Sequence, residues 1–73
     1  MLGRIIITPK EGTENYNVTY KGDTSTLNPE QTYQRLLENA HTSEITLLGS
    51  NNVLDNIIQR VRQEKKILLI NRI

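Results

Sequence analysis

The last third of the chain constrains the fold more than any other part of it. A short apolar run over 45–48 and a polar break over 49–52 lead into apolar residues at helical spacing, and a second apolar run follows over 67–70. This order predicts a strand, a loop, a helix over 52–65 and a final strand over 67–72. Because both runs are apolar at successive positions, we expect central strands that are covered on both faces.

The first part of the chain predicts two more strands. Residues 4–8 are mostly β-branched and apolar, and Pro9 ends this run because proline has no backbone donor. Residues 16–21 alternate between apolar and polar side chains, which is typical of an edge strand with one buried and one solvated face. The polar stretch that follows, 22–26, is expected to be a loop.

A clear start signal predicts a helix over 29–41. Asn28 is suited to the N-cap, Pro29 to the first helical position, and Gln31 lies three residues after the cap. The apolar residues of the helix share one stripe, so we expect it to cover a core with one side only. This stripe comprises Tyr33, Leu36, Leu37 and Ala40.

These elements predict a single α/β domain over 1–73, with α+β as the alternative class. The order is β-β-α-β-α-β, giving a four-stranded mixed sheet with two helices. Two arrangements fit, and both pair 4–8 with 16–21 as a hairpin. In one, 4–8 and 67–72 are parallel central neighbours; in the other, 45–48 and 67–72 join as a right-handed βαβ unit in a mostly parallel sheet.

The first arrangement resembles the ubiquitin-like β-grasp in the order and length of its elements. The resemblance rests on element order and on no sequence motif. The chain departs from that fold in two places: it has a long helix over 52–65 where ubiquitin has a short turn, and it ends in Asn71-Arg72-Ile73 without a diglycine. Ubiquitin-type conjugation is therefore not implied.

Composition narrows the classes of protein that the chain can belong to. It has 73 residues and no cysteine, which excludes disulfides, thiol nucleophiles and thiolate metal sites and favours an intracellular, cytoplasmic protein. The apolar stretch near the N-terminus is too short for a signal peptide or a membrane span. We therefore expect no association with membranes.

Charge is nearly balanced over the whole chain but not along it. The formal net charge is +1, which predicts no strong overall attraction to nucleic acid. Four cations near the end of the second helix can still contact phosphates, although without a stacking aromatic such binding is modest, salt-sensitive and blind to sequence. Alternatively, they complement the helix dipole and cover apolar surface with their stems. This basic cluster comprises Arg60, Arg62, Lys65 and Lys66.

Signals for catalysis are weak throughout the sequence. His41 is the only histidine and has no evident partner residues, and the carboxylates are scattered singly. The loop of Gly49, Ser50 and Asn51 before the second helix is a weak candidate for anion binding; alternatively, Ser50, Asn51 or Asn52 simply caps that helix. We predict no enzyme, no cofactor and no metal site.

The strongest argument for a partner comes from the two most apolar predicted strands, 4–8 and 67–72. Alternate side chains of a strand point to opposite faces of its sheet, so helices on one side would cover only half of these residues. Either the two helices lie on opposite faces, or another molecule closes the second face. The candidate partner-binding residues are Ile6, Leu68 and Ile70. We expect a small non-enzymatic protein-interaction or regulatory module that forms a homodimer or binds another protein, with nucleic-acid binding as the alternative.

Overall fold

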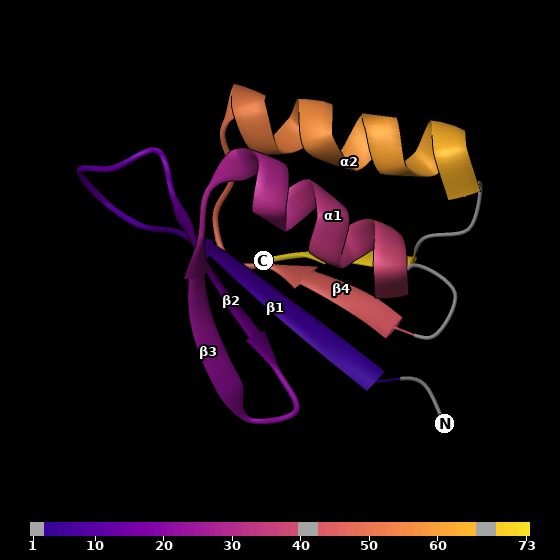
Figure 1. The fold of residues 1–73 in the computed structure, drawn as a ribbon, viewed down its shortest axis with the longest axis horizontal. Coiled ribbons are helices and arrows are strands. Elements are labelled where there is room, and N and C mark those ends of the chain that lie inside the picture. Colours follow the sequence, from indigo (N-terminus) through magenta and orange to yellow (C-terminus); the bar gives the residue numbers. More distant parts are fainter. Residues whose placement is uncertain (1–2, 40–42, 66–68) are drawn as a thin grey trace.

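Two helices lie side by side on one face of a five-stranded sheet, and the other face is left open by the described part of the chain (Figure 1). The structure is a computed structural model that describes residues 3–39, 43–65 and 69–73. The elements in chain order are β1 (Gly3–Pro9), β2 (Tyr16–Tyr20), β3 (Asp23–Leu27), α1 (Pro29–Asn39), β4 (Ser43–Leu47), α2 (Asn52–Lys65) and β5 (Leu69–Arg72).

The strands follow the order β3-β2-β1-β4-β5, so the sheet is mixed. β1 pairs with β2 and β2 with β3 in antiparallel fashion, whereas β1 and β4, and β4 and β5, are parallel. The predicted mixed sheet with two helices is confirmed, and β4, α2 and β5 join as the predicted βαβ unit. The sheet is not mostly parallel, because two of its four strand pairs are antiparallel. The alternative, with the first and last strands as neighbours in the manner of a β-grasp, is wrong.

The expected loop over 22–26 is in fact part of a hairpin, which gives five strands instead of four. Tyr20 pairs with Asp23, and the two residues between them, Lys21 and Gly22, have φ angles of 52° and 83°. Positive φ at both positions is the geometry of a tight hairpin turn. β3 therefore forms this edge of the sheet in place of β2. The residues of β3 are exposed or half-buried, so no apolar alternation marked it in the sequence. The opposite edge is β5, so the expectation that the last strand is central is wrong.

Both helices begin where the sequence predicts. The side chain of Asn28 accepts a hydrogen bond from the Gln31 N–H (2.8 Å), and the Gln31 side chain accepts one from the Asn28 N–H (3.0 Å), which is a reciprocal capping box. α2 has the predicted bounds. α1 is described to Asn39, and the predicted ends at 40–41 and 67–68 lie outside the described residues.

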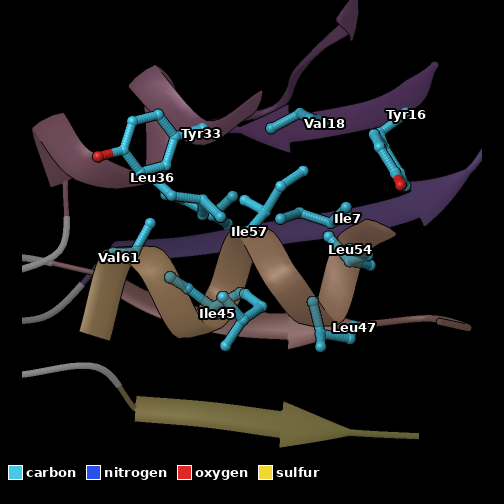
Figure 2. Packing of buried hydrophobic residues seen from close by; sticks show 12 residues of the cluster. Ile7, Tyr16, Val18, Tyr33, Leu36, Ile45, Leu47, Leu54, Ile57 and Val61 are labelled. Carbon is cyan, nitrogen blue, oxygen red and sulfur yellow. The ribbon is translucent and has the colours of Figure 1, made fainter. Parts of the chain in front are cut away.

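One hydrophobic core lies between the helices and the sheet (Figure 2). The side chains in it come from alternate positions of the three central strands and from one stripe of each helix. They are Ile5, Ile7, Tyr16, Val18, Ile45 and Leu47 from the sheet, and Tyr33, Leu36, Leu54, Ile57, Ile58 and Val61 from the helices. The expectation that central strands are covered on both faces is therefore met on one face only.

Chain connectivity explains why both helices share a face. α1 joins β3 to β4, α2 joins β4 to β5, and both connections step in the same direction across the sheet between parallel strands. Crossovers between parallel strands are almost always right-handed. Two such crossovers in the same direction place both helices on the same side.

Candidate functional site

The sheet surface opposite the helices is the main candidate site, and we call it the open face. Because Ile5 and Ile7 are buried under the helices, the alternate residues of β1 point the other way. The strand registers extend this surface across the whole sheet. It comprises Arg4, Ile6, Thr8, Asn17, Thr19, Thr24, Thr26, Glu44, Thr46, Leu69 and Asn71, with Leu48 directly after β4.

Its apolar side chains gather on the half formed by β1, β4 and β5. Ile6 is half-buried, whereas Leu48 and Leu69 are 41% and 56% exposed. The N–H of Leu48 donates to the carbonyl of Ile7 (2.9 Å), so Leu48 continues the β1–β4 ladder onto the open face. Single exposed apolar residues are ordinary on protein surfaces, but these three share one face.

The polar side chains of the open face bind one another across neighbouring strands. The hydroxyls of Thr19 and Thr24 are 2.8 Å apart, and the Thr26 hydroxyl donates to the Asn17 side-chain oxygen (2.9 Å). On the other half of the face, the Asn71 amide donates to the Glu44 carboxylate. Polar groups that already have partners cost less free energy to bury. The face therefore combines uncovered apolar side chains with paired polar ones.

The structure separates the three predicted partner-binding residues. Ile6 lies on the open face, but Ile70 pairs in register with Ile45 and packs against the core on the helix side. Its neighbour Leu69 takes the place on the open face, and Leu68 lies outside the described residues. The alternation of side chains along a strand showed that Leu69 and Ile70 lie on opposite faces of the sheet. It did not indicate which face the helices cover, because that depends on the strand order.

The basic cluster is only partly described, and its first member is engaged within the fold. The Arg60 guanidinium stacks 4.0 Å from the centre of the Tyr33 ring, and its Nη1 lies 3.9 Å from Glu30 Oε2. Arg60 therefore links α2 to α1. Arg62 is exposed, whereas the Lys65 side chain and the whole of Lys66 lie outside the described part.

The loop of Gly49, Ser50 and Asn51 acts as a helix cap. Asn51 Oδ1 accepts hydrogen bonds from the Leu54 N–H (2.8 Å) and from the Tyr16 hydroxyl (3.0 Å). The loop also has an acidic neighbour, because the Ser50 hydroxyl donates to Asp55 Oδ1 (3.5 Å). These contacts support the capping interpretation, because the Asn51 side chain is already occupied. The Asp55 carboxylate beside the loop is itself paired with Arg72, whose Nη1 lies 3.2 Å from Asp55 Oδ1.

A cavity of about 530 Å³ lies beside this cap, where both helices begin. Its lining comes from the β1–β2 loop and the two helix starts: Thr13, Glu14, Tyr16, Pro29, Asn51, Asn52 and Val53. Glu14 is the only carboxylate in this lining, and no basic residue accompanies it. His41 lies outside the described residues, and no group of three or more potential metal ligands occurs within them.

Two further findings bear on function. No helix in the described ranges is both long and apolar enough to cross a membrane. No family model, curated protein or solved structure matches the chain. The residues of the site must therefore carry the functional argument.

Proposed function

We propose that this protein is a non-enzymatic interaction module that associates with itself through the open face. The observation that carries the proposal is the open face itself, where Leu48 and Leu69 are exposed and Ile6 is half-buried among polar side chains, most of which are hydrogen-bonded to one another. A symmetric dimer is the commonest closed assembly and would remove this surface from water. A cytoplasmic location forms part of the proposal, and the cysteine-free composition supports it.

The distribution of aromatic residues favours a protein partner over nucleic acid. Sheets that bind single strands present aromatic rings on which bases stack. The chain has three tyrosines and no Phe or Trp. Tyr16 and Tyr33 belong to the core and Tyr20 packs against it, so all three lie on the helix side of the sheet.

The direct test is light scattering across a dilution series. We expect the wild type to be a dimer that dissociates on dilution, and Leu69→Lys to be monomeric with an unchanged circular dichroism spectrum, since Leu69 is largely exposed. Gln59→Lys, which adds the same charge at an exposed position of α2, is the matched control and should dimerise like the wild type. A wild type that is monomeric up to millimolar concentration would overturn the proposal.

A second titration tests the nucleic-acid alternative. Mixed-sequence DNA and RNA are added at low and high salt to the wild type and to a variant with Gln at all four positions of the basic cluster. The proposal expects no salt-sensitive binding. Tight binding at low salt that the variant loses would favour the alternative, because phosphate contacts weaken steeply with salt.

A further inference from the structure

The outward residues of β1 and β4 form rows of complementary pairs. Arg4 lies beside Glu44 and Ile6 beside Thr46 in the parallel register. Among the strand positions of the open face, all of which are described, Arg4 and Glu44 are the charged ones. Within the described residues neither of them forms an ion pair: Arg4 is exposed, and the Glu44 carboxylate accepts the Asn71 amide.

We propose that two copies pack open face to open face around a twofold axis. The axis lies in the interface, parallel to the strands and directly above the boundary between β1 and β4. This inference rests on the proposed function and specifies its geometry. Such an axis places β1 of one copy over β4 of the other while keeping each residue at the same height along the strands. Arg4 then faces Glu44 of the second copy, and Ile6 faces Thr46 of the second copy.

This geometry suits a second copy of the chain because each pair of neighbouring residues in β1 and β4 meets the same pair in reversed order. In an isologous interface every contact occurs twice, so the dimer contains two cation–carboxylate pairs and no facing like charges. The half-buried Ile6 supplies the apolar part of the β1–β4 contact, because Thr46 is only 7% exposed and offers little surface. The charges of the open face sum to zero, because Arg4 and Glu44 cancel.

The size of the face indicates a weak, reversible dimer. About this axis β1 lies over β4 and β2 over β5 of the second copy, whereas β3 extends beyond the overlap. The four overlapping strands, at a spacing of about 4.8 Å and with about 17 Å of paired length, give a projected area of about 330 Å² per copy. Stable complexes bury about 800 Å² per partner. Dissociation on dilution is therefore expected at accessible concentrations.

Charge reversal tests this geometry. Arg4→Glu and Glu44→Arg each turn two attractive contacts into two repulsive ones, so each variant alone should dimerise at least tenfold more weakly than the wild type. In an equimolar mixture the facing charges are complementary again, and native mass spectrometry should show the heterodimer at concentrations where either variant alone is monomeric. The double variant Arg4→Glu/Glu44→Arg should dimerise like the wild type and remains informative if a single variant folds poorly.

The controls carry the same charge changes on the helix layer. Arg62→Glu and Glu38→Arg alter exposed positions of α2 and α1, and mixing them should add no heterodimer beyond random exchange. If the wild type dimerises but the open-face variants do so equally well, or their mixture gains nothing, self-association stands and the face-to-face geometry is overturned. If the wild type is monomeric, both proposals fail.

Discussion

At the scale of single residues, two adjacent leucines of α1 differ sharply in their surroundings. Leu36 is fully buried, whereas Leu37 is half-buried and packs at the margin of the core. We expect Leu36→Ala to lower the free energy of unfolding by about 2–5 kcal/mol, through lost burial and a residual cavity. Leu37→Ala should cost about 1 kcal/mol, because less apolar area leaves water. Urea denaturation measures both, and equal losses would show that the facing of α1 is wrong.

Asn51 has two roles that the sequence did not reveal together. It caps α2, and it also accepts the hydroxyl of Tyr16 from β2. Asn51→Ala should therefore cost about 2 kcal/mol, against about 1 kcal/mol for Asn28→Ala, which removes a cap alone.

A double-mutant cycle separates the two roles. In a Tyr16→Phe background, the cost of Asn51→Ala should fall to about 1 kcal/mol, because no hydroxyl is left without its acceptor. An unchanged cost, measured by urea denaturation, would mean that the Tyr16 hydrogen bond contributes nothing to stability.

At the scale of elements, the β2–β3 hairpin depends on its two-residue turn. Gly22 has a φ of 83° and no neighbouring atom near the place of a Cβ, so Gly22→Ala should destabilise through backbone strain alone, by about 1–2 kcal/mol. Lys21 also has positive φ, and Lys21→Asn should stabilise by a few tenths of a kcal/mol to about 1 kcal/mol, because asparagine tolerates this conformation. Thermal melts of the two variants check the turn: Tm should fall for Gly22→Ala and rise for Lys21→Asn. A shift of Tm in the same direction for both would argue against this turn geometry.

Edge strands such as β3 are the elements that sequence patterns miss most easily. Thr24, Ser25 and Thr26 have neither an apolar face nor a helical pattern, and they form a strand because β2 offers a pairing edge and the turn brings them to it. The hydrogen bonds of Thr24 and Thr26 to β2 then fix the pairing. Such contacts exist only once the partner strand is in place.

At the scale of the whole molecule, self-association should make stability depend on concentration. Each tenfold increase in protein above the dissociation constant adds about 0.7 kcal/mol per chain, which for a domain of this size raises Tm by about 3–6 °C. Leu69→Lys should remove this dependence while Gln59→Lys keeps it. Calorimetry over two decades of concentration makes the comparison, and a wild-type Tm that stays constant would count against the dimer.

The sequence by itself determined the two helices with their starts and the approximate positions of four strands. The cap residue Asn28, the apolar spacing over 52–65 and the alternation over 16–21 act between residues a few positions apart, so they can be recognised without knowledge of the fold. Only the tertiary structure decided the strand order, the fifth strand and the side of the sheet that the helices cover. These depend on pairing between distant segments and on the handedness of two crossovers. For that reason Ile6 could be placed on the open face and Ile70 against the core only after the sheet was assembled.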